Sequence, residues 1–151
     1  MVNKATSLQP TAGFLEGKTH ILPLRVYYED TDAAGMVYHA NYIKYLERAR
    51  TDFLRVMDIW LKDWAERDDA MQFVVKSVNI EYMAPAFLDD AIRVVSTPKD
   101  LRAASMSLDQ DIYRDDTLLA RAHVVVACLD GEGRLRRVPK DVRKKLEPLK
   151  A

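Results

Sequence analysis

One long segment with helical periodicity is the feature that most constrains the fold of this chain. Over residues 42–57, apolar residues recur at the spacing of one helix face, and charged residues fill much of the remainder. Asn41 stands at the start of this segment. Before it, residues 20–29 collect β-branched and aromatic side chains with strand-like alternation, and Tyr28 falls on the apolar phase. The pattern predicts a strand followed by a long amphipathic helix.

Four further strands are predicted after the helix. Apolar and polar residues alternate over residues 77–82, residues 91–97 form the next strand, and residues 104–113 show the clearest period of two. Residues 118–129 are strongly apolar, as in a central strand, and a short helix follows Pro139. We therefore predict an α+β domain in which an antiparallel sheet of about five strands packs on one long helix. The shortage of helices excludes a doubly wound parallel sheet.

Length and composition predict a single folded domain. The chain has 151 residues, of which 48% are hydrophobic and 30% are charged, a mixture typical of a domain that buries its own core. Residues 1–18 show no periodicity and are predicted to form a mobile N-terminal arm, followed by one domain over residues 19–151. The 23 basic residues balance the 23 acidic ones, so no global field favours nucleic acid or an anionic membrane as partner.

The protein is predicted to be cytoplasmic. Cys128 is the only cysteine, so no intramolecular disulfide forms, and a reducing compartment fits this composition. No apolar run is long enough to serve as a signal-peptide core or as a membrane span. Neither a metal ion nor a cofactor is predicted.

Reactive residue types concentrate at the junction between the first strand and the long helix. Glu29, Asp30, Asp32, Tyr38 and His39 all lie in this short segment. Loop side chains at such a junction meet the positive end of the helix dipole, and loops commonly carry function. This loop is therefore the candidate site.

The residues of the loop also allow two other interpretations. Asp30, Asp32 and Gly35 match three positions of a calcium-binding loop, but Ala34 and Asn41 stand where such a loop needs ligands. Alternatively, Asp30 and Asp32 have only a structural role and bond loop amides, and His39 caps the approach to the helix.

The string YYEDTDAAGMVYHANYIKYLERAR at residues 27–50 resembles the signature of the 4-hydroxybenzoyl-CoA thioesterase family of hot-dog proteins. It is most similar to the acyl-CoA thioesterases associated with the Tol-Pal cell-envelope system. The resemblance continues through FVVKSVNIEYMAPAFLDD at residues 73–90 and spans approximately residues 20–139. It implies a hot-dog fold, in which a curved sheet wraps one long helix. It also implies a homodimer or homotetramer with active sites at the interface between protomers.

The same resemblance implies roles for three residues. Asp32 stands at the position of the catalytic carboxylate, and Tyr28 and His39 occupy positions implicated in the Tol-Pal-associated branch. The amide of His39 is expected at the helix N-terminus, where roughly half a positive charge polarises a carbonyl oxygen. Asp32 acts either as a nucleophile that forms a mixed anhydride or as a base that activates water. His39 orients Asp32, relays a proton, assists the leaving sulfur, or only caps the helix.

The rest of the loop supplies candidates for substrate contacts, namely Gly35, Met36, Val37, Tyr38 and Asn41. Gly35 also suits an unusual backbone conformation, and Asn41 suits a helix cap. Met36 and Val37, together with Tyr42 and Phe53, are expected to line an apolar slot for the acyl chain or to belong to the core.

The segment from Arg134 to Lys150 is rich in basic residues. It serves either to bind the phosphates of coenzyme A or as a solvated terminal helix. The side chains concerned are Arg136, Arg137, Lys140, Arg143, Lys144 and Lys145.

The leading hypothesis is an acyl-CoA thioesterase that hydrolyses the thioester to free acid and CoA. Two alternatives stay open at this point: a hot-dog hydratase acting on enoyl-CoA, and a non-catalytic module that binds acyl-CoA or an acyl carrier protein. Acyl carrier protein is also a possible partner of the thioesterase itself.

Overall fold

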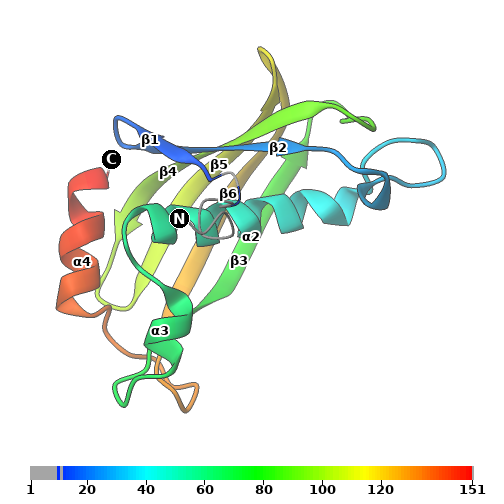
Figure 1. Cartoon of the computed structure of the whole chain (residues 1–151). Coiled ribbons are helices and arrows are strands. Elements are labelled where there is room, and N and C mark those ends of the chain that lie inside the picture. Colours follow the sequence, from blue (N-terminus) through cyan, green and yellow to red (C-terminus); the bar gives the residue numbers. More distant parts are fainter. Residues whose placement is uncertain (1–9, 11, 151) are drawn as a thin grey trace, which may run out of the picture.

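A curved antiparallel sheet of six strands wraps around one long helix in the computed structural model, which describes residues 10 and 12–150 (Figure 1). The strands follow the order β1-β2-β4-β5-β6-β3 across the sheet, and every neighbouring pair is antiparallel. The elements are β1 (Phe14–Glu16), β2 (Thr19–Arg25), the 3-10 helix η1 (Tyr28–Asp30), α2 (His39–Val56), α3 (Leu61–Ala65), β3 (Gln72–Tyr82), β4 (Ala91–Leu101), β5 (Ser105–Arg114), β6 (Thr117–Leu129), α4 (Lys140–Leu146) and the 3-10 helix η2 (Glu147–Leu149).

The core lies between α2 and the concave face of the sheet. Leu46 and Ala49 on α2 are fully buried, as are Val94, Ile112 and Val124 on the three central strands. These side chains carry the helical and period-two spacings that the sequence shows, so amphipathic patterning explains the two layers. The α+β class and the hot-dog arrangement predicted from the sequence are confirmed.

The N-terminal boundary differs from the prediction. Phe14–Glu16 fall within the expected arm, yet they form β1 and pair with β2, with Phe14 opposite Ile21. This short strand is the sixth, beyond the five expected. The remainder of the predicted arm lies mostly outside the described residues.

The first predicted strand is shorter than expected. It ends at Arg25 rather than at residue 29, because the chain turns into η1 soon after Val26, whose amide still bonds the carbonyl of Asp90 beside β4. The carboxylate of Asp30 accepts the Tyr27 amide at 2.9 Å and closes that turn. A local side-chain bond to the backbone therefore overrides the strand pattern.

A buried histidine links the N-terminal strands to α2. The Nε2 atom of His20 lies 2.7 Å from a carboxylate oxygen of Asp52, which also accepts the Gly13 amide at 2.9 Å. His20 is fully buried, stacks on Phe53, and has no hydrogen-bond partner at Nδ1. An unpaired Nδ1 suits a neutral ring that donates from Nε2 and keeps a lone pair on Nδ1. Burial lowers the pKa of His20 below its usual 6.5, although Asp52 opposes the shift.

This arrangement predicts an acid-sensitive fold. Below about pH 6.5 the unfolded chain takes up a proton at His20 that the folded chain resists, so the free energy of unfolding falls as the pH decreases. Urea denaturation of the wild type and of His20→Gln between about pH 8 and pH 5.5 checks this. We expect the variant to lose less stability over that range, and an equal loss in both proteins would contradict the assignment.

Candidate active site

Residues 31–37 form a tight hairpin that leads directly into α2. Thr31 and Val37 pair as an antiparallel bridge, and the amide of Asp32 donates to the carbonyl of Met36 at 2.8 Å. The turn closes through the Gly35 amide, which bonds the carbonyl of Asp32 at 3.0 Å. Gly35 has a φ of 77°, which confirms that this position needs the left-handed conformation that glycine adopts without strain.

The carboxylate of Asp32 lies on this turn. Its Oδ1 atom accepts the Ala34 amide at 2.9 Å, which fixes the orientation of the side chain. Asp32 is exposed in the single chain. An exposed carboxylate on this hydrogen-bonded turn is available to a ligand that approaches the N-terminal end of α2.

The helix begins two residues earlier than the sequence pattern suggested. Tyr38 is the N-cap residue and His39 is the first residue of α2, so the predicted place of the His39 amide at the helix N-terminus is confirmed. The amides of His39 and Ala40 belong to the first turn, whose N–H groups have no intrahelical acceptor. They carry the positive end of the helix dipole.

The carbonyl oxygen of Asp30 joins the hairpin to the helix. It accepts the Tyr38 amide at 2.9 Å and the Nδ2 group of Asn41 at 2.8 Å. The interpretation of Asn41 as the helix cap is therefore wrong, because this residue lies inside the first turn and its side chain reaches back to the loop. Asn41 acts on the position of the loop, and its proposed contact with substrate stays a prediction.

The imidazole of His39 sits among aromatic rings at the same end of the molecule. Its centroid lies 4.6 Å from that of Tyr38 and 6.3 Å from that of Tyr82. The Tyr82 hydroxyl donates to the carbonyl of His39 at 3.0 Å. Tyr82 was not among the sequence candidates. The one sequence feature that could have indicated a role for Tyr82 is its position as the last residue of the strand predicted over residues 77–82.

Tyr28 is placed differently from the prediction. The sequence put its ring on the apolar face of a strand, but it lies in η1 and is 82% exposed. The carbonyl of Tyr28 accepts the Thr31 hydroxyl at 2.7 Å, so its backbone supports the hairpin. Its hydroxyl lies outside the core and is free to meet a ligand or a second chain.

The other loop candidates divide between surface and core. Met36 is half-buried and bridges to Phe87, and Tyr38 is 47% exposed. Val37 is buried in the core, and so is Tyr42, whose hydroxyl accepts the Ala86 amide at 2.9 Å. The hairpin therefore brings Asp32, Met36, Tyr38 and His39 to one end of the molecule.

A cavity of about 330 Å³ opens between α2 and the sheet, beside the edge strand β3. Of the four residues expected to line an acyl slot, Phe53 lines this cavity, whereas Met36, Val37 and Tyr42 do not. Its lining is mostly apolar and comprises Glu47, Arg50, Thr51, Phe53, Leu54, Leu61, Phe73, Val74, Val75, Met106, Leu108, Val126 and Leu146.

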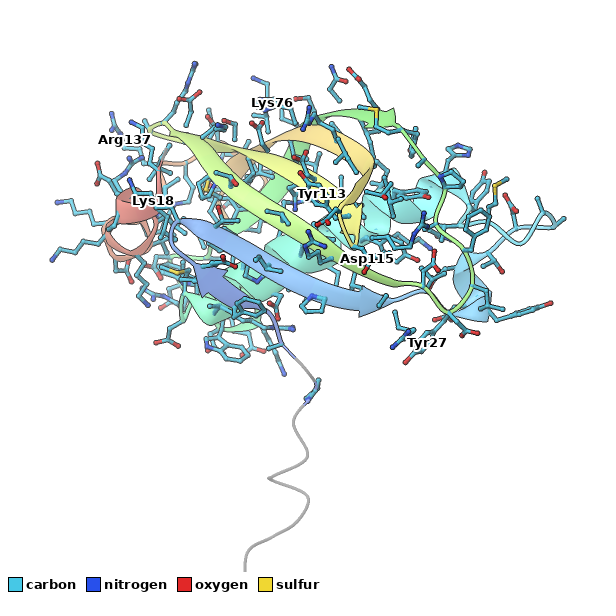
Figure 2. All side chains as sticks on the ribbon, turned by 90° about the horizontal axis from the view of Figure 1, so that it is seen from above. Lys18, Tyr27, Lys76, Tyr113, Asp115 and Arg137 are labelled. Atoms are coloured by element: carbon cyan, nitrogen blue, oxygen red, sulfur yellow. The ribbon has the colours of Figure 1, made fainter. Side chains whose placement is uncertain are left out.

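The basic C-terminal segment lies at the other end of the molecule. Figure 2 shows Arg137 beside α4 and Tyr27 at the opposite end, near the hairpin. Part of the segment is used structurally, because Arg136 donates to the carbonyl of Asp69 at 2.7 Å and Lys145 to that of Asp58 at 2.8 Å. Arg137, like Lys140 and Lys144, is exposed.

A family model described as the thioesterase-like superfamily matches residues 26–146. The chain belongs to the thioesterase-like superfamily. It is 40% identical over 130 residues to the acyl-CoA thioesterase YbgC of Haemophilus influenzae, covering 85% of this chain and 94% of that protein. It is 43% identical over 109 residues to the acyl-CoA thioester hydrolase YbgC of Escherichia coli O6:H1, covering 72% of this chain and 80% of that protein.

Solved structures agree with this membership of the thioesterase-like superfamily. A probable thioesterase from Bartonella henselae superposes with a TM-score of 0.77 at 32% identity, covering 80% of this chain and 99% of the other. A hypothetical protein from Thermus thermophilus gives a TM-score of 0.80 at 28% identity, with coverages of 85% and 98%. These findings confirm the resemblance seen in residues 27–50 and 73–90.

Within this superfamily member, the described residues hold no group of three or more His, Cys, Asp or Glu side chains placed to bind a metal ion. No helix among residues 10 and 12–150 is long and apolar enough to cross a membrane.

Burial raises the pKa of the Tyr42 hydroxyl, and burial together with the charge of Asp30 raises the pKa of the Tyr45 hydroxyl. Both phenols therefore stay protonated near neutral pH. The groups that the site offers include the Asp32 carboxylate, the His39 imidazole and the helix amides, and the exposed Tyr28 hydroxyl stays a predicted participant.

The Asn41 side chain gives a test of the loop geometry. Replacing Asn41 by Ala removes a half-buried hydrogen bond and is expected to lower the free energy of unfolding by about 1 kcal/mol. The turnover of any substrate bound at the hairpin should fall as well, because the loop loses its tie to α2. Chemical denaturation and steady-state kinetics check this. Lys44→Ala, at an exposed position of the same helix, is the control and should change neither quantity.

Proposed function

We propose that this protein hydrolyses acyl-CoA thioesters, with Asp32 as the reactive carboxylate and the first amides of α2 as the oxyanion hole. The observation that carries the proposal is the hairpin of residues 31–37. It holds a fixed carboxylate on one arm and runs into a helix N-terminus on the other. Thioester hydrolysis needs this pair of groups: one that attacks or activates water, and donors for the oxygen that becomes negative. The names of the relatives from Haemophilus influenzae and Escherichia coli support the same class of substrate.

In the proposed reaction the thioester carbonyl oxygen points at the amides of His39 and Ala40. Asp32 either attacks the carbonyl carbon to give a mixed anhydride, which water then hydrolyses, or removes a proton from the attacking water. The C–S bond breaks in both routes, and CoA leaves as the thiol after protonation of sulfur. His39, at the start of the helix, is the proposed source of that proton. The products are the free acid and CoA.

A second copy of the chain is proposed to complete the site. β3 is an edge strand with eleven residues, bonded only to β6 among the described strands, and no residue in it is buried. Val74 and Val75 are exposed along it. Long exposed edge strands with apolar residues pair readily with other strands. The opposite edge, β1, has three residues and offers little to pair with.

Pairing of two β3 strands about a two-fold axis brings the loop of one copy to the cavity of the other. Such pairing is isologous and, in one continuous sheet, antiparallel. The end of β3 at Tyr82 contacts His39, whereas Phe73, Val74 and Val75 at the other end line the cavity. The hairpin of one protomer thus approaches the cavity of its partner. Figure 2 shows Lys76 of β3 along the edge that this pairing would cover. We propose the cavity as the acyl slot.

Replacement of Asp32 by Asn tests the catalytic assignment. Asn keeps the size of the side chain and an oxygen for the Ala34 amide, but it is neither a nucleophilic carboxylate nor a base. Release of free thiol from acyl-CoA substrates of graded chain length should fall on the order of a hundredfold or more. Glu29→Gln, a nearby carboxylate outside the hairpin, is the matched control and should retain activity. Full activity of the Asp32 variant would remove this residue from the mechanism.

A heterodimer tests whether loop and cavity come from different chains. Thr51→Trp fills the cavity and leaves the hairpin intact, and Asp32→Asn does the reverse. If the site is shared, a heterodimer of the two variants has one intact site of two and about half the wild-type activity, although each parent is inactive. Co-expression with two affinity tags, thiol release and light scattering make the measurement. An inactive heterodimer would place loop and cavity in the same chain, and a monomeric wild type of 17.3 kDa would exclude the pairing.

A further inference from the structure

A charged side chain lies in the otherwise apolar cavity between α2 and the sheet. Apart from Glu47, Arg50 and Thr51, all lining residues are apolar. Of these three, Glu47 is exposed at the helix surface, whereas Arg50 is half-buried. Burial lowers the pKa of the Arg50 guanidinium, and the charge of Glu47 opposes the shift. A slot that bound only a hydrocarbon chain would gain nothing from the Arg50 cation in its wall, because a partly desolvated charge is costly without an anionic partner.

Arg50 is held by a buried amide. Its guanidinium donates to the Oε1 atom of Gln110 at 3.0 Å. Gln110 is fully buried, and its Nε2 group donates to the hydroxyl of Ser96 at 2.9 Å and to the carbonyl of Leu46 at 3.1 Å. Both N–H groups of the amide are therefore occupied, which leaves its oxygen directed at Arg50. The guanidinium is positioned by the core before any ligand arrives.

The remaining N–H groups of Arg50 lack an anionic partner. Among the described residues, no carboxylate lies within 4.0 Å of its guanidinium, although eight other basic side chains do have such a partner. A guanidinium carries five donors, of which Gln110 takes one. Its planar fork matches a carboxylate in a bidentate pair, and a partly desolvated cation gains most from an anion.

We propose that Arg50 selects acyl groups that end in a carboxylate, so that the preferred substrates are CoA thioesters of dicarboxylic acids. This rests on the proposed thioesterase function and on the cavity as the acyl slot. The apolar walls hold the methylene chain, and Arg50 binds the distal carboxylate. Arg50 does not touch the reacting atoms and acts on specificity.

The experiment compares two substrates that differ only at the far end, adipoyl-CoA and hexanoyl-CoA. The wild type should have the higher kcat/KM for adipoyl-CoA. Arg50→Met should lower the ratio of the two values by about tenfold to a hundredfold, the usual worth of a charged hydrogen-bonded pair. Arg50→Lys keeps the charge without the fork and should give an intermediate ratio. Arg48→Met, at an exposed position of the same helix, should keep the wild-type ratio.

Binding without turnover separates this inference from the proposed function. Calorimetric titration of Asp32→Asn, and of Asp32→Asn combined with Arg50→Met, gives the affinities for both thioesters even if no hydrolysis occurs. Loss of the adipoyl preference only where Arg50 is replaced supports the proposal.

A wild type that prefers hexanoyl-CoA or accepts both thioesters equally, or a ratio unchanged by Arg50→Met, overturns the role of Arg50, while the proposed hydrolysis stands. Absence of thiol release from every thioester contradicts the thioesterase function, and the affinities then still decide the role of Arg50. Circular dichroism verifies that each variant is folded, and Arg50→Lys replaces Arg50→Met if the latter is not.

Discussion

The carbonyl oxygen of Asp30 is the acceptor on which the geometry of the site depends. It binds the amide of the N-cap residue Tyr38 and the side chain of Asn41, and thereby ties the hairpin to the first turn of α2. Without this connection, the Asp32 carboxylate and the helix dipole would belong to two parts free to move apart. Catalysis by preorganised groups requires that such parts be held together before substrate binds. The core supplies the rest of the support, because α2 is anchored by its buried apolar face.

The site at the start of α2 and the cavity along its second half are separated within one chain. Residues 39 and 47 of a helix lie about 12 Å apart along its axis. An exposed carboxylate also needs cover from water if electrostatic stabilisation is to be strong. The edge pairing proposed through β3 would answer both requirements at once, because it would place a second chain over the hairpin and align each hairpin with the neighbouring cavity.

Much of the architecture follows from residue patterning, and the departures have local causes. The helical period of residues 42–57 and the alternation in β3 to β6 predicted one helix on an antiparallel sheet, because burial of one face produces those periods. The strand predicted through residue 29 failed where the Asp30 carboxylate captured the Tyr27 amide. β1 went unnoticed because three residues are too few to show a period. The same hydrogen bond explains why Tyr28 lies in η1 and not on the apolar face of the predicted strand.

The candidate site was located by residue chemistry, but its supports were not. Carboxylates, a glycine and a histidine at one junction are visible in the string itself, and the resemblance assigned their roles. The contacts of Asn41 with Asp30, of Tyr82 with His39 and of Arg50 with Gln110 join residues from 11 to 60 positions apart. The first contact joins the loop to α2, and the other two join α2 to β3 and β5, so none of them is visible as a local sequence pattern.

A crystal structure with an acyl-CoA analogue in which a methylene group replaces the thioester sulfur would test the proposed active site. The analogue keeps the carbonyl but has no bond to hydrolyse. We expect its carbonyl oxygen within hydrogen-bond distance of the amides that begin α2, with the Asp32 carboxylate facing the carbonyl carbon and the acyl chain in the cavity beside β3. A carbonyl bound away from that helix end, with Asp32 still turned to solvent, would exclude the proposed roles of Asp32 and of the α2 amides.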